Sequence, residues 1–247
     1  MSAPVAVIPS RYAAQRFPGK PLALIKGKPL VQHVVERCLE AQCFSRVLVA
    51  TDDERIRAVV QGFGAEALMT SAGCASGTDR VAEVAATLGL SAEDVVINVQ
   101  GDEPAVHPRA LATLAAAFED AAVEMATLVR ALKEDERPNP NVVKAVLDEA
   151  GNALYFSRAD LPFLMNEGSP PIPRYAHLGL YGYRARVLKK LAALPPTALE
   201  KTESLEQLRA LGHGIRIACR VTPYESQAVD RPEDVALAEA ALARLAW

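Results

Sequence analysis

Val5-Ala-Val-Ile8 is a continuous apolar run near the N-terminus, and it leads directly into the polar loop Pro9-Ser-Arg-Tyr-Ala-Ala-Gln-Arg-Phe-Pro-Gly-Lys20. An apolar run without alternation is typical of a strand that helices cover on both faces of a sheet. After Pro29, apolar residues recur at helical spacing from Leu30 to Leu39. This order of strand, loop and helix favours an α/β fold with a mostly parallel sheet flanked by helices.

Short β-branched runs and helical patterns alternate along the rest of the chain. We expect strands at 46–51, 66–69, 94–99, 142–147, 154–156, 178–183 and 215–221. We expect helices over 30–39, from 53 to about 62–64, from about 78, over 108–122, 185–193 and 203–211, and from 232 onward. Neither an internal repeat nor a low-complexity linker separates these elements. The sequence therefore predicts one α/β domain, residues 1–247, with a smaller subregion inserted in its second half.

The composition argues against several classes of protein. A net charge of −3 gives no sign of the basic face that nucleic-acid-binding domains usually show. No apolar run approaches the roughly 20 residues of a membrane-spanning helix, and the N-terminal residues do not resemble a signal peptide. We expect a cytoplasmic protein with no nucleic-acid partner and no membrane insertion.

The four cysteines also favour a reducing compartment. Cys38, Cys43, Cys74 and Cys219 lack the CxxC spacing of zinc sites and redox motifs. We expect free thiols rather than disulfides or a zinc site.

The loop after the first strand has the composition of an anion-binding segment. Residues 1–35 carry five basic side chains and no acidic one, and Arg11, Arg16 and Lys20 fall within this loop. Arginine forks and a lysine charge suit a polyphosphate, and Gly19 would let the backbone approach it closely. The loop lacks the glycines of a Walker A or dinucleotide motif. Composition alone leaves a solvated cationic surface loop as an equal alternative.

Two other polar segments follow predicted strands, where ligands bind in open α/β sheets. Asp102 lies in a turn after the strand at 94–99, where a carboxylate could bind a hard cation or simply form the turn. Ser76-Gly-Thr-Asp-Arg80 begins a predicted helix, either as an N-cap or as an anion site to which Arg80 adds a donor.

The ordered set of motifs resembles the 3-deoxy-manno-octulosonate (KDO) cytidylyltransferase family over essentially the whole chain. The segments that carry the resemblance are Ile8-Pro-Ser-Arg-Tyr12, Arg16-Phe-Pro-Gly-Lys-Pro-Leu22, Ala50-Thr-Asp52, Ser76–Arg80, Val99-Gln-Gly-Asp-Glu-Pro104, Asn139-Pro-Asn-Val-Val-Lys144, Ala153-Leu-Tyr-Phe-Ser-Arg158, His177-Leu-Gly-Leu-Tyr-Gly-Tyr183, Leu205-Glu-Gln-Leu-Arg209 and Val229-Asp-Arg-Pro-Glu-Asp234. Each motif is weak alone, but their order is specific.

This resemblance implies a magnesium-dependent enzyme that transfers CMP from CTP to the anomeric hydroxyl of KDO, releasing pyrophosphate, for lipopolysaccharide biosynthesis. It implies a Rossmann-like sheet and a homodimer. Residues 1–130 would mainly bind nucleotide, and 131–215 the sugar acid and the dimer partner. Residues 216–247 would supply the closing strand and helix with one metal ligand.

The resemblance also implies a role for individual residues. Arg11 and Lys20 match positions that grip the triphosphate and act in catalysis, with Arg16 close by, and Ser76 and Arg80 match positions near the CTP. Asp102 and Asp230 match the two magnesium ligands, which are also catalytic. The sugar-acid pocket would be formed by Gln100, Arg158, His177, Tyr181, Glu206 and Gln207, with Arg158 taking the carboxylate.

Other interpretations stay open at this point. On their own, Arg158 could belong to a surface ion pair, His177 to the core, and Glu206 and Gln207 to a solvated helix face. The acceptor could instead be an amino-substituted KDO, sialic acid or another sugar. A non-catalytic nucleotide-binding module is a further alternative, although binding alone would not require both Asp102 and Asp230.

Overall fold

A central sheet organises the structure, a computed structural model that describes residues 2–13, 16–166 and 172–245. The strands are β1 (Val5–Ser10), β2 (Leu24–Ile25), β3 (Lys28–Pro29), β4 (Arg46–Thr51), β5 (Glu66–Met69), β6 (Val95–Asn98), β7 (Met125–Ala131), β8 (Lys144–Leu147), β9 (Ala153–Ser157), β10 (Tyr175–Arg184) and β11 (Ala218–Val221). The α-helices are α1 (Leu30–Glu40), α2 (Glu54–Gly62), α3 (Gly77–Thr87), α4 (Pro108–Ala116), α5 (Ala185–Ala193), α6 (Ala198–Glu203), α7 (Gln207–Gly212) and α8 (Asp234–Leu245). Short 3₁₀ turns lie at Lys20–Leu22, Ala117–Glu119 and Glu134–Glu136.

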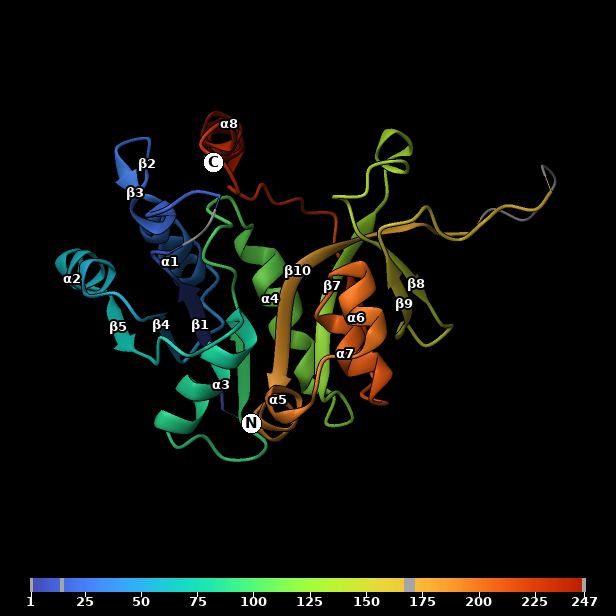
Figure 1. Ribbon diagram of the computed structural model, residues 1–247, viewed down its shortest axis with the longest axis horizontal. Helices are drawn as coiled ribbons and strands as arrows, with labels where there is room; N and C mark the ends of the chain where they lie inside the picture. The colour runs from blue at the N-terminus through green and yellow to red at the C-terminus, as the bar shows by residue number, and fades with distance from the viewer. Residues whose placement is uncertain (1, 14–15, 167–171, 246–247) are drawn as a thin grey trace.

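The sheet has nine strands in the order β11-β7-β10-β6-β1-β4-β5, with β8 and β9 added beside β10 (Figure 1). The strands β6, β1, β4 and β5 are parallel, as the N-terminal half of the sequence predicts. β10 runs antiparallel between β6 and β7, and β8 and β9 extend it into a smaller antiparallel unit. The predicted α/β architecture with a smaller second sheet region is confirmed.

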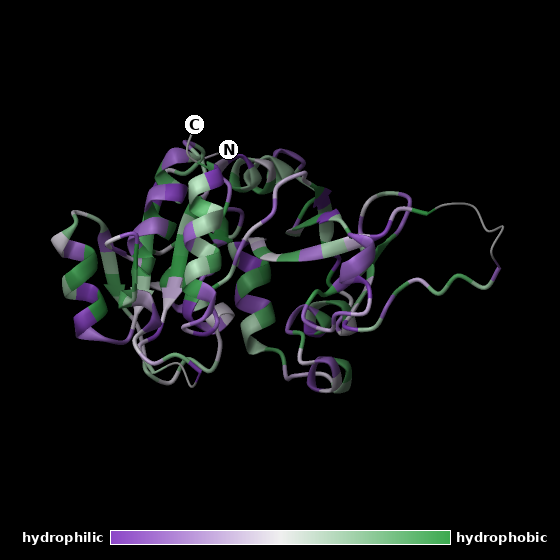
Figure 2. Cartoon of the chain, turned by 90° about the horizontal axis from the view of Figure 1, so that it is seen from above, coloured by the Kyte–Doolittle hydropathy of each residue, from purple (hydrophilic) through white to green (hydrophobic). Residues whose placement is uncertain are grey.

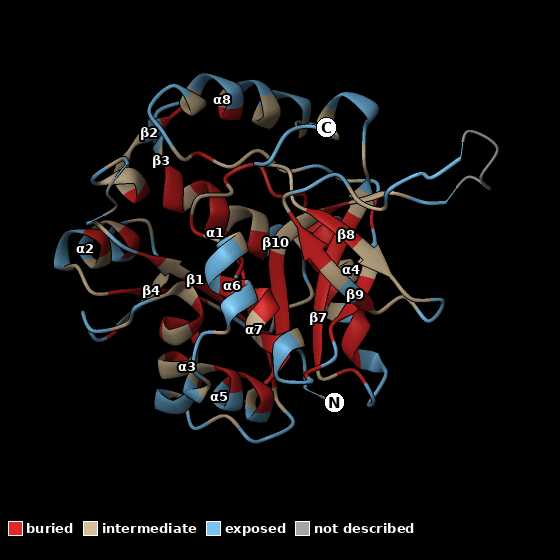
Figure 3. Ribbon diagram, turned by 45° about the vertical axis from the view of Figure 1, so that its right-hand side comes forward, coloured by how far each residue is buried: buried red, intermediate tan, exposed pale blue. Residues whose placement is uncertain are grey.

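Alternate residues of β1 point to opposite faces of the sheet, and each face has its own core. Ala6 and Ile8 pack with the apolar stripes of α1, α2 and α4. Val5 and Val7 pack with those of α3, α5 and α7. Figure 3 shows the buried strands between these two helical layers. β1 is therefore covered on both sides, which explains its uninterrupted apolar sequence.

Three of the differences between the predicted elements and the structure have a clear physical reason. β7 is absent from the predictions, because its Met-Ala-Thr-Leu-Val-Arg-Ala sequence closely follows an alanine-rich helix and has no clear period. That helix, predicted to extend to Ala122, ends as α4 at Ala116 and tightens into a 3₁₀ turn. The helix predicted over 203–211 is two helices, since Ser204 has a left-handed backbone with φ of 52° and ends α6.

The described residues between β9 and β10, 158–166 and 172–174, extend away from the body of the molecule (Figure 2). In its described part, Phe163 and Met165 are about four-fifths exposed. The proline-rich loop noted at Gly168–Pro173 lies mostly outside the described residues.

Two expectations about the whole chain can be compared with the described residues. Cys38, Cys43, Cys74 and Cys219 are free thiols, as predicted. Within the described ranges, every helix is too short or too polar to cross a membrane.

Candidate active site

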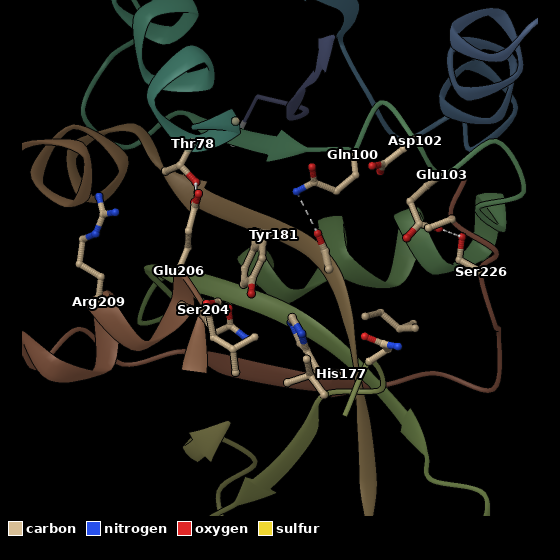
Figure 4. Close-up of a pocket in the computed structure, with 18 of the residues that line it drawn as sticks. Thr78, Gln100, Asp102, Glu103, His177, Tyr181, Ser204, Glu206, Arg209 and Ser226 are labelled. Atoms are coloured by element: carbon tan, nitrogen blue, oxygen red, sulfur yellow. Dashed lines mark hydrogen bonds between the residues drawn. The ribbon is translucent and has the colours of Figure 1, made fainter. Parts of the chain in front are cut away.

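A cavity of about 570 Å³ lies beyond the carboxyl ends of β1 and β6, where the parallel half of the sheet meets β10 and α7 (Figure 4). A smaller cavity of about 160 Å³ adjoins it at the loop after β1. Arg11, Gly77, Gln100 and Asp102 line both. This is the edge of the sheet at which ligands bind in open α/β folds.

The smaller cavity depends on a close crossing of two loops. A Cβ atom at Gly101 would lie 2.5 Å from the carbonyl oxygen of Pro9, so only glycine fits there. In the loop after β1, Gly19 has φ of 72° and its N–H donates to the carbonyl of Tyr12. This turn places Lys20 at the start of a 3₁₀ helix facing the β6 end.

Lys20 joins two carboxylates that are far apart in the sequence. Its Nζ lies 2.8 Å from Oδ2 of Asp102 and 3.6 Å from Oδ1 of Asp230. Arg16 also pairs with Asp230, at 3.0 Å, but its side chain is 63% exposed, so this contact is weaker. The sequence prediction that Asp102 and Asp230 act together thus has a geometric basis in the described residues.

The carboxylates of Asp102 and Asp230 could hold a cation. Among the described residues there is no cluster of three or more histidine, cysteine or acidic side chains arranged to bind a metal. Two carboxylates with room for phosphate oxygens and water are, however, the donor set that Mg²⁺ commonly uses in nucleotide sites. The charge of Lys20 between them shows that a positive group fits there.

Glu103 adds a third carboxyl group that the sequence analysis does not single out. It lines the larger cavity and accepts a hydrogen bond from Ser226. Burial, together with the nearby charges of Asp102 and Asp230, raises the pKa of Glu103 to about 7. In the sequence, the position of Glu103 directly after Asp102 is the signal that could have identified it as a site residue.

The opposite wall of the larger cavity comes from β10 and the junction of α6 with α7. Five of the predicted sugar-acid residues line this cavity: Gln100, His177, Tyr181, Glu206 and Gln207. Figure 4 shows Gln100 beside Asp102 and Glu103, with His177 and Tyr181 across the cavity on β10. The structure therefore brings most of the predicted pocket together.

A β-bulge in β10 directs its side chains toward the cavity. The pairing of β10 with β7 shifts register between Leu178 and Tyr181. The Nε2 of His177 lies 2.9 Å from Oγ1 of Thr127, and burial lowers the pKa of His177 to about 3, so the ring is neutral. Because Thr127 Oγ1 donates to the carbonyl of Leu180, it can accept from a protonated Nε2.

The α7 side contributes polar groups of two kinds. Glu206 accepts a hydrogen bond from Oγ1 of Thr78, which links α7 to α3 across the cavity. The Nε2 of the buried Gln207 has no hydrogen-bond partner among the described residues. Buried polar groups are nearly always paired, so an unpaired amide that lines a cavity suits a polar ligand.

Besides Arg16 and Asp230, three predicted site residues line neither cavity: Arg158, Ser76 and Arg80. Arg158 donates to the carbonyl oxygens of Pro140, Glu203 and Ser204 and so ties two wall segments together from behind. Ser76, rather than Thr78 or Asp79, caps α3, and it forms a capping box with Asp79. Arg80 is fully buried and bonds to Asp52 and Thr70. As placed here, none of the three offers a donor to a ligand in the cavities.

Arg130 and Arg209 line the larger cavity without having been predicted. Arg130 forms a two-pronged ion pair with Glu136, at 2.7 and 2.6 Å. Arg209 pairs in the same way with Glu200. Arg209 falls inside the quoted motif Leu205–Arg209, whereas Arg130 is the next-to-last residue of β7, the strand that sequence periodicity missed.

Comparison with known proteins agrees with this geometry. Residues 5–217 match the cytidylyltransferase family model. The chain is 58% identical to the 3-deoxy-manno-octulosonate cytidylyltransferase of Myxococcus xanthus (strain DK1622), covering 96% of this chain and 95% of the relative. It is 47% identical to the 8-amino-3,8-dideoxy-manno-octulosonate cytidylyltransferase of Shewanella piezotolerans, covering 96% and 97%.

Solved structures give the same result. CMP:2-keto-3-deoxy-manno-octonic acid synthetase complexed with CTP aligns with a TM-score of 0.91 and 41% identity, covering 98% of this chain and 99% of that one. A glucose-1-phosphate thymidylyltransferase from Bacillus anthracis shares the fold, with a TM-score of 0.66 and 17% identity. The chain belongs to the cytidylyltransferase family.

Proposed function

We propose that this protein transfers CMP from CTP to KDO, giving CMP-KDO and pyrophosphate, with Mg²⁺ as cofactor. The observation that carries the proposal is the Lys20–Asp102–Asp230 cluster where the two cavities meet. A cation site between a phosphate-sized cavity and a larger polar cavity suits the joining of a nucleotide to a polyhydroxylated acid.

In this proposal, Arg11 and Lys20 bind the triphosphate in the smaller cavity, which both residues line. Asp102 and Asp230 hold Mg²⁺, which lowers the charge barrier between the phosphates and the anionic sugar acid when it is bound. The anomeric oxygen of KDO attacks the α-phosphorus, and the bond to the pyrophosphate oxygen breaks. The protein acts mainly by positioning the reactants and stabilising charge.

The acceptor is held by the polar wall of the larger cavity. Tyr181 and the neutral His177 offer hydrogen bonds to hydroxyl groups, and Gln207 offers its unpaired amide. Of the arginines that line the larger cavity, Arg130 and Arg209 are paired with glutamates, and Arg11 lines both cavities. Arg158 lies outside and donates to three backbone carbonyls. We therefore assign the sugar carboxylate to the Arg11 side of the cavity and keep Arg158 as a support for its walls.

The test is pyrophosphate release with CTP, KDO and Mg²⁺, omitting each in turn. Release should need all three. An amino-substituted KDO is the second candidate acceptor, because a relative at 47% identity is an 8-amino-3,8-dideoxy-manno-octulosonate cytidylyltransferase. Competition between the two sugar acids at equal concentration decides between them, and a preference for the amino sugar would overturn the assignment to KDO.

We also propose a cytoplasmic homodimer that supplies lipopolysaccharide biosynthesis. The exposed apolar side chains Phe163 and Met165 on the projecting segment support dimerisation, since monomeric proteins rarely expose large apolar patches. Light scattering of the purified protein tests it. A monomer at micromolar concentration would refute this part alone.

A further inference from the structure

Asp230 is held in place by a segment with no regular secondary structure. The strap, residues 222–233, connects β11 to α8 and carries Asp230 past the loop that carries Asp102. Among the described residues, one backbone hydrogen bond joins the strap to that loop, from the N–H of Val229 to the carbonyl of Asp102, at 2.9 Å. Side chains must therefore fix how far along the loop the strap lies.

Two further contacts run in the same direction along the loop. The ring of Tyr224 stacks on His107 with centroids 3.7 Å apart. The hydroxyl of Ser226 donates to Glu103. With the Val229–Asp102 bond, the contacts pair strap residues 224, 226 and 229 with loop residues 107, 103 and 102, so the numbers rise in the strap and fall in the loop. The strap thus lies antiparallel to the loop in a defined register.

This register decides where the second carboxylate lies. Asp230 directly follows Val229, whose side chain is fully buried, so the register of Val229 places the Asp230 carboxylate beside Asp102. In an extended segment, a slip of one residue turns each side chain to the opposite side. A slipped strap would therefore direct Asp230 away from Asp102.

We propose that Ser226 is a positioning residue for the cation site: its hydrogen bond to Glu103, with Tyr224 stacked on His107, sets the register that brings Asp230 to Asp102. The proposal deepens the function proposed above and rests on it for the identity of the cation. The strap contacts themselves are independent of any ligand.

The side-chain contacts of Asp230 could not serve this purpose during turnover, and its backbone N–H bonds to Asp234 at the start of α8 rather than to the loop. Arg16 is largely exposed, and Lys20 is assigned to the triphosphate in the proposed mechanism. Once Lys20 binds phosphate, Asp230 loses that partner. Ser226 and Tyr224 instead contact Glu103 and His107 on the loop that carries Asp102, and neither partner is assigned to the triphosphate.

Hydrogen exchange at the Val229 amide measures the register without any ligand. In the metal-free protein, Ser226→Ala should speed this exchange about tenfold relative to the wild type, because the loss of a hydrogen bond to an acidic group lowers the cost of local opening. Tyr224→Leu should do the same, whereas Tyr224→Phe keeps the stacked ring and should exchange like the wild type.

Binding of Mn²⁺ in the presence of CTP, followed by electron paramagnetic resonance, measures the cation site directly. Ser226→Ala should weaken Mn²⁺ about tenfold, and Ser226→Thr, which keeps the hydroxyl, should restore most of the affinity. Ser45→Ala is the matched control, because Ser45 also joins distant segments through its hydroxyl, at Ala3, but lies far from the site.

The outcomes separate the two proposals. Unchanged Val229 exchange and unchanged Mn²⁺ affinity in Ser226→Ala, with an intact melting transition, would overturn the role of Ser226. If Ser226→Ala has a lower melting temperature than the wild type, the Val229 amide exchange and the Mn²⁺ affinity of Tyr224→Leu decide instead. A wild-type protein that turns over CTP and KDO without a divalent cation would instead overturn the metal assignment, while the exchange experiment still tests the strap.

Discussion

The two walls of the larger cavity are built on different principles. On the nucleotide side, the loops after β1 and β6 follow neighbouring parallel strands, so Lys20 and Asp102 meet because their strands do. On the sugar side, His177 and Tyr181 depend on a bulge in the antiparallel β10, and Gln207 on a helix break at Ser204. The first wall follows from topology, whereas the second depends on local irregularities.

The largest expected effect comes from breaking the nucleotide wall at its carboxylate pair. Asp102→Asn removes one of the two carboxylates of the proposed cation site and the 2.8 Å partner of Lys20. We expect kcat for pyrophosphate release to fall about a thousandfold while the melting temperature stays close to that of the wild type. Asp135→Asn, an exposed site on another loop, is the matched control. Near-normal turnover in Asp102→Asn would show that the pair does not bind the catalytic cation.

Lys20→Ala tests the same wall while keeping both carboxylates in the chain, although it removes their shared partner. Removing the ammonium group should lower kcat/KM for CTP by about a hundredfold, since charge on the transferring phosphoryl group is no longer balanced. The KM for KDO should change little. Steady-state kinetics with each substrate varied separately gives the answer, and an effect confined to the KM for KDO would contradict the assignment.

Gln207→Leu tests the sugar wall. The KM for KDO should rise about tenfold and the KM for CTP should stay constant, because the amide of Gln207 faces the larger cavity. The free energy of unfolding without ligand should stay equal or rise by about 1 kcal/mol, since an unpaired buried amide is removed. A loss of stability with unchanged kinetics would instead indicate a purely structural role.

The smallest effect concerns the pH dependence of stability. Burial lowers the pKa of His177 from 6.5 to about 3, so the unfolded chain binds a proton at this residue while the folded protein does not. Stability is therefore fully present above pH 6.5 and is lost as the pH falls below it, by about 1.4 kcal/mol at pH 5.5. Denaturant unfolding of the wild type and of His177→Gln at pH 7.5 and 5.5 measures this difference. Parallel losses in both proteins would argue against a neutral buried ring.

The same contrast explains how much the sequence could predict. β1, β4 and β6 are apolar runs with clear boundaries, and the loops at their ends already contain Arg11, Lys20 and Asp102. β7 has no period of its own and is buried by its neighbours, so it could not be separated from the preceding helix. Sequence patterns report local preference, and β7 is defined by its pairing with β10 and β11.

For the site residues, the sequence could not predict the direction in which each side chain points. Gln100, His177, Tyr181, Glu206 and Gln207, which the motifs imply together, line one cavity, and their binding of the sugar acid stays a prediction. They could not show that Arg158 points behind the wall to three carbonyl oxygens, or that Arg80 is buried against Asp52. Glu103 escaped notice because its importance comes from the strap, which is distant in sequence.

The position of β10 within the sheet has a mechanical consequence. It is hydrogen-bonded to β6 through residues 181–184 and to β7 along most of its length, so both walls of the cavity belong to one continuous sheet. A hinge that swung the two halves apart would have to break the pairing of Tyr181 with Asn98 and of Gly182 with Ile97. Opening and closing of the cavity would therefore involve segments at its rim, such as the α6–α7 junction, rather than the sheet at its floor.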